Sequence, residues 1–409
     1  MSEVTQPCRV CEGRGSYVVA GDGQEELVSC ASCSGSGAVA RREPEVVTSS
    51  RLVAYRLCKR LHWYKYIRLR RPRRVAKPLA FGTVVHAALA AWWLAYARGA
   101  GEDEALADAL EALVAAFREL AEDLEEMDLV KADVMVRGYH LRWWEPPGSR
   151  RWVVAGVERS LRAPLVNPAT KRASVSYVRG GKLDGLLRDV RTGELWILEH
   201  KTTSGDLSPE SVYWRKLRMD GQVSTYFALA QTMLSGDERV RGCLYDVLAK
   251  PQQRQLAATP EEARKTTKGK KCKACKGTGE GPYVAGSQCA ECGGSGWAEP
   301  PKLYANQRDQ DESLDDYAAR VAAAIAEAPD QYYARAEVVR LEAEVEEHAA
   351  DDWSTAKSMH EERQAGRFPR NVDACFRGND PCPYWNVCCG AEDVANDAVF
   401  RDARPNEEL

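Results

Sequence analysis

Four short segments share the pattern CxxCxGxG, and this repeat constrains the organisation of the chain more than any other feature. The segments read CRVCEGRG, CASCSGSG, CKACKGTG and CAECGGSG. Four thiolates from two such knuckles make one tetrahedral zinc site, because the glycines free backbone N–H groups to point at sulfur. We therefore expect two zinc modules, one over residues 1–40 and one inserted over residues 265–299. Their cysteine pairs are Cys8/Cys11, Cys30/Cys33, Cys272/Cys275 and Cys289/Cys292.

The repeat resembles the zinc-binding region of DnaJ-type chaperones, over these two segments only. The resemblance implies zinc rather than chaperone activity, because no J-domain signature accompanies the cysteines. We expect local pairing, of the first knuckle with the second and of the third with the fourth. Cross-pairing between the modules and free thiols in loops are the alternatives. A DnaJ-like chaperone remains a third functional hypothesis, which suppression of the aggregation of an unfolded client would test.

The rest of the chain is suited to a large globular core. The protein has 409 residues, of which 44% are hydrophobic, and its formal net charge is only −3. Overall charge therefore does not indicate a nucleic-acid partner, and any basic surface has to be local. The start MSEVTQPCRV lacks a charged and then apolar leader, and the apolar run near residues 87–97 is too short to span a bilayer. We expect a cytoplasmic protein without membrane contact, whose 14 cysteines serve as metal ligands rather than disulfides.

Hydrophobic periodicity predicts an α/β core between the two modules. Strands are expected over residues 152–161, 175–189, 195–202 and 240–248, with a hairpin closed at residues 191–193. Helices are expected over residues 50–68, 81–99, 104–127, 219–234 and 313–328, and over the charged stretch 337–348. The predicted domains are therefore a core over residues 41–264 and a C-terminal segment of helices and cysteines over residues 300–409.

Three charged residues lie together on the predicted central hairpin. In LEHKT, the side chains of Glu199 and Lys201 point to one face of the strand, and Asp184 on the preceding strand approaches them from the side. Buried carboxylates need compensation, and two of them suit Mg²⁺ or Mn²⁺. A lysine beside such an ion can hold a water molecule for attack on a phosphodiester. An ordinary ion pair between Glu199 and Lys201 is the alternative.

Asp184 followed by Glu199-x-Lys201 resembles the signature of the PD-(D/E)XK nucleases, in their RecB-like branch. The resemblance implies a restriction-endonuclease-like α/β core, with a central mixed sheet flanked by helices. It also implies that Asp184 and Glu199 hold the metal ion and that Lys201 orients the attacking water. The chain departs from the signature before Asp184, where Lys182 and Leu183 replace the expected proline.

Two further motifs resemble that branch and occur in its order. FGTVVHAAL supplies His86, which the resemblance makes an additional metal ligand on a helix. GQVSTYFAL supplies Gln222 and Tyr226, which would support the substrate and the geometry of the site. Glu158, in GVERSL on the first strand, is a weaker candidate that is equally well explained as a solvated strand residue.

A second group of cysteines lies in the tail CFRGNDPCPYWNVCC. Cys375, Cys382 and Cys388 need a fourth partner, for which Cys58 is the candidate. One early and three late cysteines resemble the iron–sulfur nucleases of the RecB-like group, including the AddB type and the CRISPR-associated exonucleases. The resemblance implies a 4Fe–4S cluster, which would tie the first helix to the tail as a structural staple. Zinc is the alternative, and Cys389 could replace Cys388; the lone cysteine of RGCLYDVL is expected to be a core thiol.

Basic and aromatic residues are interleaved over residues 51–77, without any acidic residue. Cations neutralise phosphates and aromatic faces stack on unpaired bases, which favours single-stranded DNA as a partner. The alternative is a helix whose aromatic side chains pack inward. A second basic stretch, RKTTKGKKCKACK, leads into the second module and either extends the DNA surface or is a plain loop. The aromatic residues of the first stretch are Tyr55, Trp63, Tyr64 and Tyr66.

The leading functional hypothesis is a metal-dependent DNA exonuclease that acts on single-stranded DNA or DNA ends. Its setting would be recombination, repair or phage DNA processing in a bacterial or phage-infected cell. No GxxxxGK[ST] motif is present, so unwinding would need a helicase or recombination protein as partner. The competing hypothesis is a DNA-binding scaffold with a vestigial nuclease site, which the intact Asp184, Glu199 and Lys201 disfavour. Cleavage polarity, strand preference and endonuclease versus exonuclease action stay open.

Overall fold

The computed structural model describes residues 5–7, 12, 14, 16–21, 24–30, 34–36, 38–40, 43–236, 238–281, 286–378 and 380–409. Two antiparallel strand pairs form the N-terminal segment, β1 (Thr5–Pro7) with β4 (Ala38–Ala40) and β2 (Ser16–Gly21) with β3 (Gln24–Ser29). Cys30 is buried. The other three cysteines of the first predicted module, Cys8, Cys11 and Cys33, lie outside the described residues, so this module stays a prediction.

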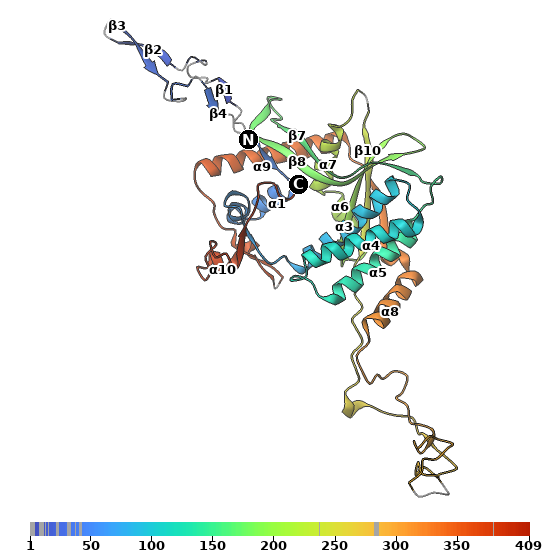
Figure 1. The fold of residues 1–409 in the computed structure, drawn as a ribbon. Helices are drawn as coiled ribbons and strands as arrows, with labels where there is room; N and C mark the ends of the chain where they lie inside the picture. Colours follow the sequence, from blue (N-terminus) through green and yellow to red (C-terminus); the bar gives the residue numbers. More distant parts are fainter. Residues whose placement is uncertain are drawn as a thin grey trace.

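A six-stranded sheet forms the centre of the folded body (Figure 1). Its strand order is β13-β10-β9-β8-β5, with β7 paired on β8. β9 runs parallel to β10 and β5 parallel to β8, whereas the other pairs are antiparallel. The predicted central mixed sheet is thus confirmed, and it is consistent with a restriction-endonuclease-like fold. The strands are β5 Glu45–Val47, β7 Trp152–Val166, β8 Ala173–Asp189, β9 Leu195–Thr203, β10 Val240–Ala249 and β13 Tyr333–Val338.

Helices bury both faces of the sheet, as predicted. Trp196 and Leu198 of β9 face a core built with α3, α4, α5 and α8, whereas Ile197 faces a core built with α6 and α7. This alternation follows from the two-residue period of a strand. A third, smaller core joins α1 and α9 to β5, β7 and β8. The helices are α1 Ser49–Leu57, α3 Lys77–Ala97, α4 Glu102–Glu119, α5 Glu126–Trp143, α6 Val212–Leu217, α7 Gly221–Gln231, α8 Leu314–Glu327 and α9 Glu342–Gln364.

Some predicted helices differ from the observed ones for local reasons. The helix expected over residues 104–127 stops at the end of α4, and α5 starts anew at a capping box in which Glu125 and Asp128 accept each other's backbone N–H groups. The helix expected over residues 50–68 breaks at Cys58, whose backbone is extended. The prediction of a helix over residues 337–348 is wrong at its start, because Glu337 pairs with β10 as part of β13.

α3 is longer than the apolar run seen in the sequence. It has 21 residues, so by length and composition alone it could cross a membrane, which corrects the expectation that no run is long enough. However, 56% of its most apolar window is buried inside the protein. Leu89, Trp92 and Trp93 are buried among α4, α5 and the sheet. α3 is therefore packed as a core helix, and the expected lack of membrane contact stays a prediction.

A long arm, residues 256–312, projects from the body (Figure 1). Its base is fastened by the buried carboxylate of Glu312, which accepts hydrogen bonds from Arg320 at 2.7 and 2.8 Å and from the Leu256 amide at 3.0 Å. Its end holds the antiparallel strands β11 (Lys270–Lys271) and β12 (Trp297–Glu299). The second predicted module thus lies at the end of the arm, and the predicted domain boundaries stay predictions.

The C-terminal tail packs on the basic and aromatic stretch that follows α1. Trp63 stacks on Phe368 with ring centroids 5.5 Å apart, and Tyr64 stacks on Tyr384 at 5.1 Å. The hydroxyls of the other two aromatic residues donate to glutamates of α9 and of the C-terminal end. Tyr55 and Tyr64 are buried and the other two rings are half-buried, so inward packing holds for these rings, and stacking on bases stays a prediction. The smaller elements here are α2 Lys59–His62, η1 Trp63–Ile67, β6 Arg70–Pro72, η4 Val372–Ala374, β14 Phe376–Arg377, β15 Asp380–Pro381, α10 Trp385–Cys388 and β16 Phe400–Asp402.

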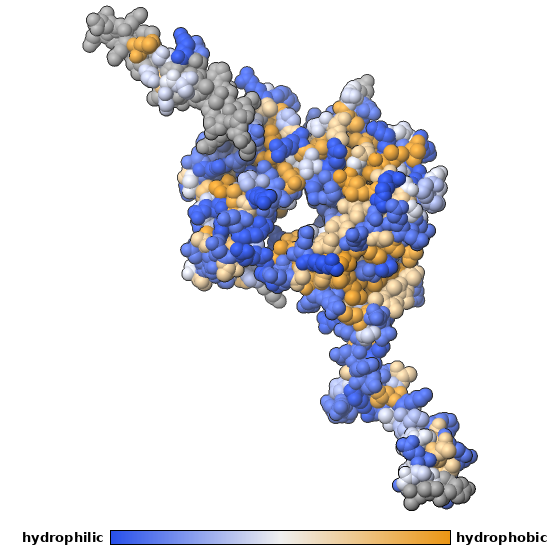
Figure 2. Space-filling view, viewed as in Figure 1, coloured by the Kyte–Doolittle hydropathy of each residue, from blue (hydrophilic) through white to orange (hydrophobic). Residues whose placement is uncertain are grey.

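The folded body has an opening through it (Figure 2). In this view the opening lies between the part of the body that holds α1 and α10 and the part that holds α3. A polymer that passed through such an opening would need a free end.

Candidate active site

Two neighbouring strands bring the first pair of predicted site residues together. β8 and β9 are antiparallel, and Gly185 pairs with Leu198, so Asp184 and Glu199 are the next residues across the ladder. The ladder ends there, and Asp184 Oδ2 accepts the backbone N–H of His200 at 2.7 Å. Because β8 and β9 are internal strands, the two carboxylates lie in the middle of the sheet.

Lys201 connects this strand pair to α7. Its ammonium donates hydrogen bonds to Glu199 and to Gln222 Oε1, the latter at 3.0 Å. Gln222 Nε2 lies 2.6 Å from the hydroxyl of Tyr226, one helical turn further on. Asp220 caps the start of α7, because its carboxylate accepts a hydrogen bond from the backbone N–H of Gln222 at 2.8 Å. The structure thus brings four of the predicted residues into one hydrogen-bonded chain.

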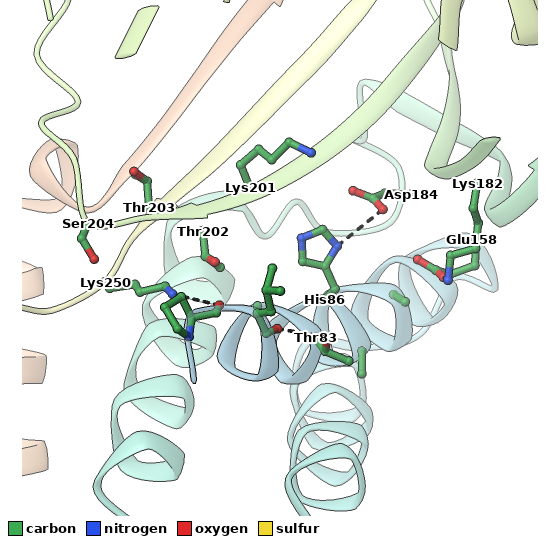
Figure 3. A pocket seen from close by; sticks show the side chains of 15 residues that line it. Thr83, His86, Glu158, Lys182, Asp184, Lys201, Thr202, Thr203, Ser204 and Lys250 are labelled. Carbon is green, nitrogen blue, oxygen red and sulfur yellow. Dashed lines mark hydrogen bonds and ion pairs between the residues drawn. The ribbon is translucent and has the colours of Figure 1, made fainter. Parts of the chain in front are cut away.

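His86 reaches the cluster from α3. Its Nδ1 lies 3.5 Å from Asp184 Oδ1, and Figure 3 shows the ring pointing at that carboxylate. The ring also lies against that of His200, at 6.1 Å between centroids. All six residues that the resemblance singled out are therefore in one cluster, while their individual roles stay predictions.

Burial and nearby charges shift the pKa values of the cluster in opposite directions. Burial raises the pKa of Glu199 to about 7, although Lys201 opposes this shift. Asp184 is buried too, but His86, His200 and Lys201 outweigh burial and hold the pKa of its carboxyl well below its usual range. Burial disfavours the charge of Lys201, but the Glu199 and Asp184 carboxylates outweigh it and raise the pKa of the ammonium. Lys201 is therefore a charged donor and not a base.

The donor set fits a hard divalent cation. Glu199 is 2% exposed, and its Oε2 has no hydrogen-bond partner among the residues that the structure describes. A buried carboxylate oxygen without a partner is costly, and a cation bound to it would remove that cost. Two carboxylates that leave room for water and phosphate oxygens are typical of Mg²⁺ and Mn²⁺ sites. Asp184 and Glu199 would hold such an ion, and His86 is placed to add a nitrogen.

A cleft of about 870 Å³ opens onto this cluster. Figure 3 shows Lys250 at one end, Glu158 and Lys182 at the other, and His86 between them. Glu158, the weaker candidate of the sequence analysis, lines the cleft and forms an ion pair with Lys182. Its role as a metal ligand stays a prediction. No motif in the sequence marks Lys250, which also lines the cleft.

A buried ionic network lies behind the cluster, and sequence reasoning missed it as well. Asp246 of β10 is fully buried, and its Oδ2 accepts hydrogen bonds from the hydroxyl of Tyr139 at 2.7 Å and from Arg335 Nη2 at 3.2 Å. His200 Nδ1 lies 3.4 Å from the same oxygen. Trp93 Nε1 donates to the Tyr139 hydroxyl at 3.1 Å. The network joins the sheet to the helix that carries the site histidine, and no local motif marks its members.

The cysteines at the end of the arm form a compact group. The sulfur atoms of Cys272 and Cys289 are 4.0 Å apart, and those of Cys275 and Cys292 are 3.7 Å apart. All four lie within 4.8 Å of one another, so they could bind a single metal ion. Backbone N–H groups of the knuckle glycines outweigh burial and lower the pKa of Cys275 to about 6, which favours the thiolate. The third and fourth knuckles are thus together, as expected for local pairing.

The four cysteines predicted for the C-terminal cluster also lie near one another. Cys58 Sγ accepts the backbone N–H of residue 371 at 3.4 Å, and the carbonyl of that residue accepts from Cys375 Sγ at 3.6 Å. The Cys382 amide donates to the Cys375 carbonyl at 2.7 Å. Burial, together with the nearby thiols, raises the pKa of Cys382 and of Cys388. The fold therefore brings Cys58 close to cysteines that lie more than three hundred residues later in the sequence.

The remaining cysteines differ in exposure. Cys388 packs beside Cys382 against the aromatic core of the tail, whereas Cys389 is exposed. Cys243 is fully buried in β10 beside Ile197 and α7, as expected for a core thiol.

A family model described as the PD-(D/E)XK nuclease superfamily matches residues 46–389 of the chain. The matched range begins in β5 and ends in the tail, so it includes the whole charged cluster, the arm and the tail cysteines. A comparison with curated proteins gives no match.

Proposed function

Because the chain belongs to the PD-(D/E)XK nuclease superfamily, we propose that it is a metal-dependent DNA exonuclease of the RecB-like branch. The observation that carries this proposal is the buried Glu199 oxygen that has no partner in the described part of the chain, beside Asp184 and Lys201 at the cleft. The opening through the body supports exonuclease action, because a strand that passes through it needs a free end. Its substrate is single-stranded DNA or a DNA end, in recombination, repair or phage DNA processing in the cytoplasm of a bacterial or phage-infected cell. A helicase or recombination protein would unwind duplexes for it.

The side chains of the site divide the work of phosphodiester hydrolysis. Asp184 and Glu199 would hold a Mg²⁺ or Mn²⁺ ion, which would supply a Lewis acid for the attacking water and for the charge on the phosphate. Lys201, which stays protonated, donates a hydrogen bond that orients the water and stabilises its developing negative charge. Gln222 fixes the ammonium of Lys201 in place. His86, which lies on α3 beside Asp184, would add a nitrogen ligand.

The tail cysteines Cys58, Cys375, Cys382 and Cys388 form the second cofactor site of the proposal. Among the described residues, the arm cysteines form the group that is compact enough for a single ion. A cubane cluster spaces its thiolates further apart than a single ion does, which suits the four tail cysteines. The exposed side chain of Cys389 supports Cys388 as the fourth ligand. A cluster bound here would restrict a loop of more than three hundred residues and so stabilise the fold.

Protein purified without oxygen is therefore expected to be brown, with absorbance near about 400 nm. Cys382→Ser should lose this absorbance and unfold at a lower temperature, because the tail would no longer be tied to the end of α1. The matched control Cys389→Ser should retain both properties. A colourless wild-type protein that contains only zinc would overturn the iron–sulfur assignment.

We also propose that the arm is a zinc module, in which zinc is bound by Cys272, Cys275, Cys289 and Cys292. Its lysines support a role in DNA binding, because they are exposed and form no ion pair within the described part of the chain. Cations of this kind add a salt-dependent attraction for any nucleic acid. These residues are Lys265, Lys268, Lys271, Lys273 and Lys276.

Digestion of end-labelled linear and circular single-stranded DNA tests the proposed activity. With Mg²⁺ or Mn²⁺ we expect loss of the linear substrate and survival of the circle, because the circle has no end. Loss of both would make the protein an endonuclease. Binding of DNA without cleavage by the metal-loaded wild type would favour the DNA-binding scaffold instead.

A further inference from the structure

The lysines that line the cleft differ in how their charges are balanced. Lys201 donates to Glu199, and Lys182 forms an ion pair with Glu158. At the opposite end, the ammonium of Lys250 has one hydrogen bond, to the carbonyl of Pro78 at 3.3 Å, and lies 4.7 Å from the centre of a phenylalanine ring. No carboxylate of the described residues is within ion-pair distance of it.

The backbone holds Lys250 in this position. Its amide donates to the carbonyl of Thr203 at 2.7 Å, which extends the pairing of β9 and β10 by one residue beyond the strand end. The side chain therefore starts beside the run Thr202, Thr203 and Ser204, whose hydroxyl-bearing residues line the same end of the cleft (Figure 3). This end of the cleft offers a cation and hydroxyl donors.

An anion would complete this end of the cleft. The side chain of Lys250 is half-buried, and burial lowers its pKa, so the charged form is poorly compensated in the free protein. Asp128 attracts the ammonium of Lys250 only from a distance, and its own carboxylate is already paired with Lys77 at 3.0 Å. A phosphodiester is the anion that the neighbouring site would deliver, since successive phosphates follow one another along a nucleic-acid strand.

We propose that Lys250, together with Thr202 and Ser204, forms a subsite for a backbone phosphate of the DNA strand, adjacent to the phosphate that is cleaved. This inference rests on the proposed nuclease function. A contact to the backbone fixes the position of the strand and carries no sequence preference. The subsite thus places the strand so that its next phosphate meets Asp184 and Lys201.

The test compares Lys250→Met with Lys250→Arg and with Lys131→Met, a half-buried lysine of α5 that does not line the cleft. Binding of a fluorescent oligothymidylate is measured by anisotropy over a range of salt concentrations with Ca²⁺, which fills oxygen-ligand sites. We expect Lys250→Met to weaken binding about tenfold and to lower the slope of log affinity against log salt by about 0.7, the value for one phosphate contact on a single strand. Lys250→Arg should retain both values, and Lys131→Met should behave as the wild type.

In the cleavage assay with Mn²⁺, Lys250→Met should raise KM more than it lowers kcat. An unchanged salt slope would overturn the subsite even if affinity fell, because it would indicate lost packing instead of a lost ionic contact. Equal behaviour of Lys250→Met and Lys131→Met would overturn it too. If the wild type binds the oligonucleotide but does not cleave it, the proposed function fails, while the salt slope still decides the subsite.

Discussion

Glu199→Gln is expected to abolish metal-dependent DNA cleavage, with a loss of at least about 10²- to 10³-fold in kcat. Glutamine keeps the size and shape of the side chain but has no negative charge with which to bind a divalent cation. Because burial already raises the pKa of Glu199 to about 7, the substitution removes a costly buried charge. It also removes one of the two carboxylates that balance the buried ammonium of Lys201, but Asp184 remains. The unfolding temperature should therefore change little, which separates loss of chemistry from loss of fold. Both are measured on the same preparation.

The control for this variant is Glu194→Gln, an exposed glutamate just before the same strand, which should retain full activity. The pH dependence of the wild type gives an independent check. The raised pKa means that Glu199 holds a proton below about pH 7, and a metal ion has to displace it. Apparent Mn²⁺ affinity should thus fall as the pH drops through 7 and level off above it. Full cleavage by Glu199→Gln would remove this residue from the mechanism.

Arg335→Met is expected to destabilise the protein by about 3–5 kcal/mol, because it leaves a buried carboxylate without its cation. Asp246 is fully buried, and Arg335, with His200, outweighs burial and holds its pKa at about 2. The double variant Asp246→Leu/Arg335→Met should recover much of the loss, since it removes both charges together. Chemical denaturation measures the free energy of unfolding in each case.

Arg137→Met is the matched control for the buried arginine. Arg137 forms an exposed pair with Asp133 on α5, at 2.7 Å, and its loss should cost about 0.5 kcal/mol or less. A double variant that is no more stable than Arg335→Met would show that the network stabilises through geometry rather than charge balance. Equal stability of Arg335→Met and Arg137→Met would contradict the buried ion pair itself.

Much of the sheet and of the charged cluster could be predicted because their signals are local. In strands β7 to β10, apolar residues either alternate with polar ones or form short continuous runs. These patterns predict strands, so the positions of all four followed from the sequence within a few residues. Glu199 and Lys201 had to share a face because they are two residues apart on a strand. α5 was missed, because no helix was predicted beyond residue 127; a polar capping box, and not a change of periodicity, marks its start.

Only the tertiary structure decided which segments that are distant in the sequence pack against each other. From the sequence alone came the mixed α/β core, the cysteine pairs and the motif residues, since each depends on spacing along one element. Only the folded chain turned the aromatic residues after α1 inward onto the tail, placed Lys250 at the end of the cleft, and joined Asp246 to Tyr139 and Arg335. The physical reason is that burial and charge balance depend on partners a hundred or more residues away, and no local pattern records them.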